Sequence, residues 1–328
     1  MRALCVGLNP TLQRTLQCGT VHVNAVNRAE RFRLDVAGKG ANVARVLSQL
    51  GVDAVHLSHA GGLMAGRWRA SCEADGFAVV GPEAPGEIRT CTTVIDTSAG
   101  TTTEFIEPAA EVDEKVVDGV RRAFREEAAR CDVAVFSGSM APGYPRDMYL
   151  WMIDVARELG VRLVLDISGP VLRDAVRGGD LLLKVNAREF GASFAPELRD
   201  ALPALESEGR SVSDDERMRA TFTRMMRRLE ADGVCLVISQ GKRPSLIYDS
   251  ETDALREVPT IPMEPVNTIG CGDAMTAALT ARLLDQAGSP FGDDLADLVE
   301  YSHTMAAINA SLLKPGSIRD TPALDERD

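Results

Sequence analysis

Short runs of valine, isoleucine and leucine alternate with amphipathic helical patterns along the chain, and this alternation limits the folds that it can adopt. Such nearly continuous apolar runs are typical of parallel strands that are buried on both faces. The five clearest runs are Arg2–Leu8, Asp132–Ser137, Val161–Ile167, Asp180–Val185 and Gly233–Ser239. Helical patterns lie between them, for example at residues 41–50, where Gly51 follows as the expected stop. The sequence therefore predicts an α/β fold with a mostly parallel sheet and helices on both faces.

Two segments interrupt this alternation. Thr11–Ala37 is predicted to be extended without a long buried run, and Ile88–Glu107 to form two threonine-rich strands around a turn at residues 97–100. We expect both segments to form a small β lid appended to the main sheet. The acidic, proline-containing stretch from Ala192 to Glu216 is predicted to be a helical excursion whose charges face water. No internal repeat is evident, so residues 1–328 are predicted to form one domain.

The composition disfavours several classes of protein. The 328 residues carry a formal net charge of −12, whereas a nucleic-acid-binding protein is expected to show a basic stripe. The seven cysteines are scattered singly, without zinc-site spacing, which suits a reduced cytoplasmic setting. The amino terminus lacks a signal-peptide pattern, and no apolar run reaches the ~18 residues of a transmembrane helix. We therefore expect a soluble cytoplasmic protein that binds neither nucleic acid nor membrane.

The stretch NTIGCGDAM, residues 267–275, places an aspartate in the first turn of a predicted helix, directly after a glycine-rich turn. Gly270, Cys271 and Gly272 can present successive N–H groups at the positive end of that helix. Asp273 could accept a proton from an attacking hydroxyl while the amides hold the developing charge. The alternative is a simple helix cap, which gives the two glycines little purpose. The thiol of Cys271 either points away while its amide works, or has a pKa lowered by the helix N-terminus.

A second glycine turn opens the helix that follows Ala37. Gly38, Lys39 and Gly40 precede Asn42, so backbone amides and an amide side chain gather at a helix N-terminus. Neither glycine stretch completes the dinucleotide fingerprint G-x-G-x-x-G, and the Walker signature is absent. A nicotinamide-dependent oxidoreductase is therefore disfavoured. From the residues alone, this turn is either a ligand site or a tight turn capped by Asn42.

Ten short segments match, in order, those of one enzyme family. They are Leu8–Pro10, Asn27-Arg28, residues 38–51, Gly61–Gly66, Arg89, Ser137–Gly143, Leu165–Gly169, Lys184–Phe190, Ile238–Gly241 and residues 267–275. Along most of its length the chain resembles the ribokinase-like (PfkB-type) carbohydrate kinases, and within them the branch of 1-phosphofructokinase and tagatose-6-phosphate kinase. The resemblance implies a ribokinase-like fold with a small β-sheet lid. It also implies that ATP, Mg²⁺ and a sugar phosphate bind.

The resemblance assigns catalytic and acceptor-binding roles to residues of this chain. Asp273 corresponds to the catalytic base. Gly270, Cys271 and Gly272 correspond to the anion hole that stabilises the transferring phosphoryl group. The residues that correspond to the acceptor site are Gln13, Arg28, Gly38, Lys39, Gly40, Asn42, Arg89 and Ser139. Of these, Arg28, Arg89 and Ser139 are expected to hold the phosphate that the sugar already carries. Arginine suits this role because its planar guanidinium group can bind a phosphate through two hydrogen bonds.

The resemblance also implies a nucleotide site and a metal site. The residues expected to contact the nucleotide are Lys184, Asn186, Ser239, Gly241, Ala306 and Asn309. Asn186 and Glu189 match the element N-x-x-E, which helps to hold Mg²⁺ through water. Without the match, these two residues would most simply be a helix N-cap and a first-turn acid. The histidines match no role and are expected to be at the surface or partly buried: His22, His56, His59 and His303.

The chain departs from the family pattern at several positions. Gln13 stands where the branch carries an aspartate that binds sugar hydroxyls. The family usually has an asparagine near the position of Cys91 and another at the position of Ile106. A glutamine brings no charge but can accept a hydrogen bond. These three positions lie on the acceptor side, so they leave the sugar's identity open while the ATP side is intact. Val185 replaces a proline and Gln240 a leucine, and neither change is expected to matter.

These observations favour an ATP- and Mg²⁺-dependent kinase that phosphorylates a hydroxymethyl group of a small sugar phosphate. Fructose 1-phosphate or tagatose 6-phosphate is the leading acceptor. The lid is expected to close over the sugar and exclude water and, by family analogy, to pair two subunits. Two alternatives remain open. One is a kinase for an unphosphorylated sugar or nucleoside, and the other is a non-catalytic regulator that keeps the fold and binds sugar or nucleotide.

Overall fold

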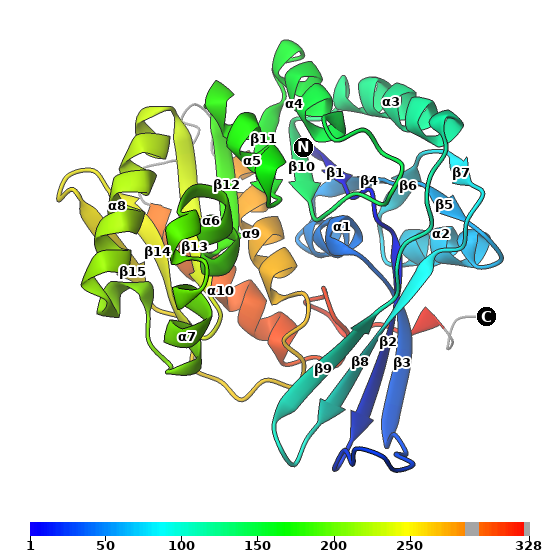
Figure 1. The fold of residues 1–328 in the computed structure, drawn as a ribbon. Coiled ribbons are helices and arrows are strands. Elements are labelled where there is room, and N and C mark those ends of the chain that lie inside the picture. The colour runs from blue at the N-terminus through cyan, green and yellow to red at the C-terminus, as the bar shows by residue number, and fades with distance from the viewer. Residues whose placement is uncertain (286–294, 325–328) are drawn as a thin grey trace.

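The computed structural model describes residues 1–285 and 295–324, and a nine-stranded sheet forms its centre (Figure 1). The strands follow the order β15-β14-β13-β12-β11-β10-β1-β4-β6. Their bounds are β1 (Arg2–Val6), β4 (Asp53–Leu57), β6 (Ala78–Val80), β10 (Val133–Ser137), β11 (Arg162–Asp166), β12 (Leu181–Asn186), β13 (Val234–Gln240), β14 (Arg243–Asp249) and β15 (Ala254–Val258). Pairing is parallel from β6 to β13, and β14 and β15 are antiparallel. The five predicted apolar runs are confirmed as the adjacent strands from β13 to β1.

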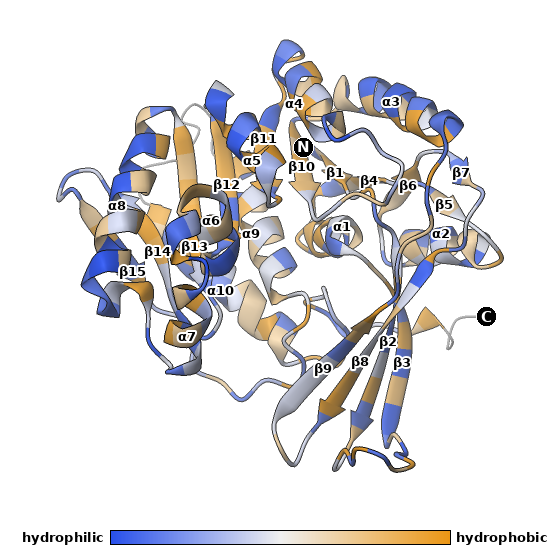
Figure 2. Cartoon of the chain, in the orientation of Figure 1, coloured by the Kyte–Doolittle hydropathy of each residue, from blue (hydrophilic) through white to orange (hydrophobic). Residues whose placement is uncertain are grey.

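Helices cover both faces of this sheet, and each face has its own hydrophobic core. One core includes α3 (Glu114–Ala128), α4 (Met148–Glu158), α5 (Pro170–Ala175), α6 (Ala187–Phe194), α7 (Ala201–Ser207) and α8 (Glu216–Ala231). The other includes α1 (Lys39–Gln49), α2 (Ala65–Ala74), α9 (Cys271–Asp285) and α10 (Leu295–Ala310). Figure 2 shows apolar residues along the central strands and polar residues on the outer sides of α3 and α8. Among the described helices, none is long and apolar enough to cross a membrane.

The predicted lid is a separate four-stranded sheet with the order β3-β2-β8-β9, and it extends away from the main body (Figure 1). Its strands are β2 (Thr11–Cys18), β3 (Arg31–Ala37), β8 (Arg89–Asp96) and β9 (Thr101–Ile106). The two predicted segments are joined by the parallel pairing of β2 with β8. A further two-stranded sheet, of β5 (Ala60–Gly61) and β7 (Glu83–Ala84), lies elsewhere in the chain. The expectation of a small β appendage is therefore confirmed.

The carboxyl ends of the parallel strands bring polar residues together at one edge of the main sheet. Ser137 at the end of β10 is in register with Asp166 at the end of β11. Asn186 at the end of β12 is in register with Ser239 in β13. Because ligands of α/β sheets bind outside the carboxyl ends of the strands, this edge is where a site is expected.

Replacement of Phe136 tests the hydrophobic core that supports the carboxyl ends of the parallel strands. Phe136 lies in β10 with no exposed surface, and its ring centroid is 6.0 Å from that of Phe124 and 5.7 Å from that of Tyr149. We expect Phe136→Ala to lower the free energy of unfolding by about 3–5 kcal/mol, because the core cannot fill the resulting cavity. Denaturant unfolding measures this loss. Val23→Ala, at a site that is 96% exposed, is the control and should cost under ~0.5 kcal/mol. Equal losses in the two variants would contradict the packing.

Candidate active site

The glycine turn that is predicted to form an anion hole lies at the start of α9. Gly270 has a φ of +84°, and a Cβ there would lie 2.2 Å from the backbone nitrogen of Gly316, so only glycine fits. The turn is therefore pressed against the segment that follows α10. A Cβ at Gly272 would lie 2.8 Å from Nζ of Lys184. The N–H groups of the first helical turn and this ammonium group thus lie together, as an anion site requires.

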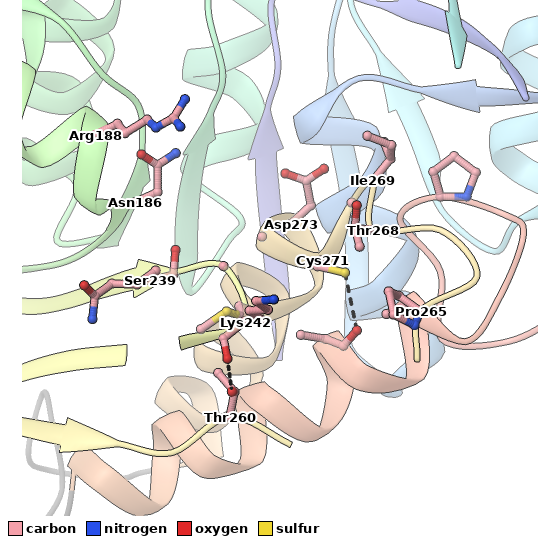
Figure 3. A pocket seen from close by; sticks show the side chains of 18 of the residues that line it. Asn186, Arg188, Ser239, Lys242, Thr260, Pro265, Thr268, Ile269, Cys271 and Asp273 are labelled. Carbon is pink, nitrogen blue, oxygen red and sulfur yellow. Dashed lines mark hydrogen bonds between the residues drawn. The ribbon is translucent and has the colours of Figure 1, made fainter. Parts of the chain in front are cut away.

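Asp273 lies in the first turn of α9 with only 6% of its surface exposed. Asn42 Nδ2 donates to Asp273 Oδ2 at 2.7 Å, and no other described side chain donates to this carboxylate. Burial raises the pKa of Asp273 to about 6, against the opposing effects of Lys39 and the Asn42 hydrogen bond. In Figure 3 the carboxylate points into the space between Asn186 and Ile269. A carboxylate with this pKa is mostly ionised at neutral pH and basic enough to take a proton.

A buried carboxylate that was given no role from the sequence, Asp166, lies near Asp273. Asp166, 1% exposed at the end of β11, accepts from Lys39 Nζ at 3.2 Å and lies 3.6 Å from Lys184 Nζ. Thr276 Oγ1 donates to its other oxygen at 3.0 Å. Burial alone would raise the pKa of Asp166, but Lys184 and Lys39 hold it below its ordinary value. Its place at the carboxyl end of a buried strand was the signal that could have identified it.

The lysine of the second glycine turn is also directed at this charged group. Lys39 Nζ lies 3.2 Å from Asp166 and 3.5 Å from Glu189 Oε1. Asp166 is the main reason why the pKa of Lys39 is raised, so this ammonium group stays charged. The result is a pair of cations, Lys39 and Lys184, next to the anion-hole turn.

A cavity of ≈ 1250 Å³ runs from the lid past Asp273 to α10. Most of the predicted site residues line this cavity. They are Gln13, Gly38, Lys39, Asn42, Arg89, Lys184, Asn186, Glu189, Ser239, Gly241, Gly270, Cys271, Gly272, Asp273 and Ala306. Residues from the lid, both glycine turns and the sheet edge therefore share one space. This space is large enough for a nucleotide and a small sugar to lie end to end.

A smaller cavity of ≈ 180 Å³ lies at the lid end, and Lys39 and Arg89 line both. Gly40 and Ser139 line the smaller one. Asn9 Nδ2 donates to Ser139 Oγ at 3.3 Å, so this hydroxyl is held in place. The smaller cavity thus combines a guanidinium, an ammonium and a hydroxyl group, which suits an anion.

Two predicted site residues line neither cavity. Arg28 is exposed and belongs to the connection between β2 and β3, and this connection lies at the far end of the lid (Figure 1). Asn309 is fully buried behind the anion-hole turn, where its Nδ2 donates to Ile269 O at 3.0 Å and its Oδ1 accepts from Ser317 N at 3.0 Å. The amide of Asn309 is used within the protein, so this residue holds the turn instead of contacting a ligand in the cavity.

The three departures on the acceptor side are neighbours in one row of the lid. Gln13 is in register with Cys91, and Cys91 is in register with Ile106. All three line the larger cavity. Gln13 Nε2 donates to Thr93 Oγ1 at 2.7 Å, which directs Oε1 of this amide away from Thr93. The lid row therefore offers the cavity one amide oxygen, one thiol and one apolar side chain.

Asn186 and Glu189 form a capping box at the start of α6. Asn186 Oδ1 accepts from the Glu189 backbone, and Glu189 Oε2 accepts from the Asn186 backbone, each at 2.9 Å. The simpler interpretation, a helix cap with a first-turn acid, is therefore correct as local structure. Glu189 Oε1 is left beside Lys39 in the cavity wall, where it can accept from metal-bound water. The described residues contain no cluster of three or more metal-ligating side chains.

The Cys271 side chain is turned away from the anion hole. Its sulfur lies 3.5 Å from the backbone oxygen of Ala306 in α10 (Figure 3). Burial raises the pKa of this thiol above its ordinary value. The alternative of a lowered thiol pKa is therefore wrong, because desolvation outweighs the helix N-terminus.

The histidines are more buried than expected. His22 is exposed, but the other three are less than one-tenth exposed: His56, His59 and His303. His303 lines the larger cavity, where it bonds Ser245 Oγ and Pro259 O, each at 2.8 Å. Since both of its ring nitrogens are used by the protein, burial of this histidine is structural.

Gln240 has a structural role that the sequence analysis did not expect. It is 5% exposed, and its amide accepts from Val212 N at 2.8 Å and donates to Ser211 Oγ at 3.0 Å and Pro244 O at 2.7 Å. These bonds attach the predicted helical excursion to β13. The excursion is confirmed as helical, but its charges do not all face bulk water, because Glu206 and Arg210 line the larger cavity. A leucine could not make these hydrogen bonds.

Comparison with known proteins agrees with this geometry. A model of the pfkB family carbohydrate kinases matches residues 9–323. The chain belongs to the PfkB family of carbohydrate kinases. Family membership makes it an ATP-using enzyme, which speaks against the alternative of a non-catalytic regulator.

Individual relatives support the same placement. A 1-phosphofructokinase of Xanthomonas campestris pv. campestris is 28% identical and covers 97% of this chain and 93% of its own length. A 1-phosphofructokinase of Rhodobacter capsulatus is 28% identical, over 85% of this chain and 83% of its own. Phosphofructokinase-2 from Escherichia coli, solved with substrates and products, has a TM-score of 0.75 at 23% identity, covering 94% and 93% of the two chains. A possible 1-phosphofructokinase from Thermotoga maritima reaches 0.80 at 20%, covering 96% and 93%. The two solved structures confirm the predicted ribokinase-like fold.

Gln240→Leu tests whether the excursion shapes the nucleotide end of the cavity. The variant leaves the Val212 N–H without its acceptor, so the wall that carries Arg210 should loosen. We expect the KM for ATP to rise about fivefold, the equivalent of one lost hydrogen bond, with the KM for the sugar unchanged. Steady-state kinetics with each reactant varied gives both constants. A rise in the sugar KM alone would contradict this assignment.

Proposed function

We propose that the enzyme transfers the γ-phosphoryl group of ATP to a hydroxymethyl group of a small sugar phosphate. Fructose 1-phosphate is the first candidate and tagatose 6-phosphate the second. The single observation that carries the proposal is the position of Asp273, a buried carboxylate with a pKa of about 6, between an anion-binding turn and a cavity that reaches Arg89. The names of the two curated relatives support fructose 1-phosphate as the acceptor.

The phosphate that the acceptor already carries belongs, in this proposal, in the smaller cavity beside Arg89 and Ser139. A guanidinium can hold phosphate oxygens through two parallel hydrogen bonds. The sugar then lies over the Gly38–Gly40 turn with its free hydroxymethyl group directed at Asp273. Arg28 can reach such a phosphate only when the lid of a second subunit brings it there, because it is exposed at the end of its own lid.

Proton transfer and phosphoryl transfer follow from this arrangement. Asp273 Oδ1 takes the proton of the acceptor hydroxyl, while Asn42 holds Oδ2. The acceptor oxygen then forms a bond to the γ-phosphorus, and the bond from that phosphorus to the bridging oxygen breaks, so ADP leaves with the electron pair. The amides at Gly270–Gly272 and the ammonium group of Lys184 stabilise the charge on the transferring group.

The remaining cavity holds the nucleotide in this proposal. Ser239 and Gly241 at the β13–β14 connection and Ala306 in α10 line the part of the wall away from the lid. Mg²⁺, when bound, would neutralise phosphate charge, and Asn186 and Glu189 are the residues that would hold its waters. Lys39 lies 3.5 Å from Glu189 and keeps that carboxylate oriented toward the phosphates.

The lid is proposed to pair two subunits. Its face opposite the Gln13 row carries Phe32 in register with Leu16, and Leu16 in register with Val94. Phe32 is 61% exposed, and Phe105 on the same face is 62% exposed. A second lid could bury this apolar face. The proposed setting is the cytoplasm, which the seven free cysteines support.

Asp273→Asn tests the proposed base. We expect turnover to fall by about 10²–10⁴-fold while ATP still binds, because the amide cannot accept the proton. Coupled ADP release is measured with fructose 1-phosphate, tagatose 6-phosphate, fructose 6-phosphate, fructose and ribose. Wild-type turnover should require a phosphorylated acceptor and should fall as the pH drops through about 6, where Asp273 becomes protonated.

The control for this variant is Asp285→Asn, the same chemical change at an exposed site at the far end of α9. It should leave turnover unchanged. Wild-type turnover on fructose or ribose and not on the sugar phosphates would move the proposal to the kinase for unphosphorylated acceptors. Equal activity of Asp273→Asn and the wild type would rule out Asp273 as the base.

Gln13→Asp tests whether the lid row contacts the sugar. A carboxylate can accept from two sugar hydroxyls, and Thr93 can then donate to it. We expect the KM for the sugar phosphate to fall about three- to tenfold, with the KM for ATP unchanged. Gln17→Asp, on the same strand but outside both cavities, is the matched control. If both variants change the sugar KM equally, the row does not bind the acceptor.

A further inference from the structure

The amide of Asn42 lies between the base and a second charged group. On one side its Nδ2 donates to Asp273 Oδ2 at 2.7 Å. On the other side its Oδ1 accepts from NH1 of Arg45 at 3.1 Å. Asn42 and Arg45 are in the same helix, α1, so the three side chains form one continuous line from α1 to α9.

The orientation of this amide is fixed by the chemistry of its two neighbours. Arginine has only donors, so the side of Asn42 that faces Arg45 must be its oxygen. The Asp273 carboxylate has only acceptors, so the side that faces it must be the NH₂ group. Without the guanidinium, the amide would keep its hydrogen bond to the carboxylate but lose the bond that holds its other end, so its position would be fixed less firmly.

Arg45 itself is held rigidly and has no exposed surface. Its Nε donates to Asp75 Oδ2 at 2.6 Å, and its NH1 and NH2 donate to Gly316 O at 3.0 Å and Val36 O at 2.5 Å. Asp75 also accepts from Lys314 Nζ at 2.9 Å. Asp75 therefore keeps one cationic partner if Arg45 is replaced, which limits the cost of removing the guanidinium.

We propose that Arg45 is a positioning residue for the catalytic base: its guanidinium fixes the Asn42 amide, and that amide holds one carboxylate oxygen of Asp273 so that the other faces the acceptor. This inference rests on the proposed role of Asp273 as the base. Arg45 touches neither reactant, because it lies outside both cavities. Its effect reaches the reaction only through Asn42.

The consequence is a lower pKa for the base than its burial alone would give. A donated N–H stabilises the ionised carboxylate, and loss of that donor raises the pKa. The other groups that face Asp273 are Lys39 from α1, Asp166 from β11, Lys184 from β12 and Cys271 from α9 itself. None of them bonds Arg45, so replacing Arg45 leaves them in place.

The test follows the pKa of the Asp273 carboxyl by carbon NMR in the full-length protein, with the signal assigned by its absence in Asp273→Asn. Arg45→Met and Asn42→Leu should each raise this pKa by about half a unit to one unit. The double variant should show no more than the rise in Asn42→Leu, because Arg45 acts through Asn42. The pH at which turnover is half-lost should move upward in the same way. If Arg45→Met does not fold, Arg45→Lys takes its place. It keeps a positive charge beside Asp75 but has no guanidinium group to reach Asn42, so it should raise the pKa of Asp273 by the same amount.

Arg33→Met is the matched control. Arg33 is also a buried arginine, it pairs with Asp35 at 2.6 Å, and Asp35 keeps Lys314 at 4.0 Å, but Arg33 does not contact Asn42. It should lower stability and leave the pKa of Asp273 unchanged. An unchanged pKa in Arg45→Met, or a full extra rise in the double variant, would overturn the role of Arg45. The titration needs no turnover, so an inactive wild type would count against the proposed function alone.

Discussion

The buried carboxylate of Asp166 binds the ammonium groups of Lys39 and Lys184, and the rest of the active site depends on this charged cluster. Without this shared anion, the two ammonium groups would repel each other. The cluster joins the start of α1 to the ends of β11 and β12, and it lies beside the anion-hole turn of α9. Two positive charges are therefore held beside this turn by the protein itself, which is the electrostatic preorganisation that the proposed phosphoryl transfer needs.

The lid supplies the other half of the site from a different part of the sequence. Parallel pairing of β2 with β8 puts Gln13 and Cys91 side by side, and the β8–β9 hairpin adds Ile106 to the same row. This row is a surface built by strand register, and a change at one member alters the surroundings of the others.

Local patterns predicted much of this protein. Continuous apolar runs predicted the central strands, and the spacing of Gly270, Gly272 and Asp273 predicted a glycine turn followed by an aspartate in the first turn of a helix. The roles of that turn as an anion site and of Asp273 as a base stay predictions. Asn309 and Cys271 were interpreted less well, because the direction of a side chain on a helix depends on what packs against it. Asn309 faces Ile269 and Ser317 instead of the cavity, and burial reverses the pKa shift that a helix N-terminus suggests for Cys271.

The sequence by itself determined the α/β fold, the family and the residue types at the anion-hole turn of α9. Each of these depends on patterns that span only a few neighbouring residues. The tertiary structure alone decided the line from Arg45 through Asn42 to Asp273 and the sharing of Asp166 between two lysines. Asn42 and Asp273 lie 231 positions apart, and Lys39 and Asp166 lie 127 apart. Contacts over such separations exist only once sheet order and helix packing are fixed, so no local pattern specifies them.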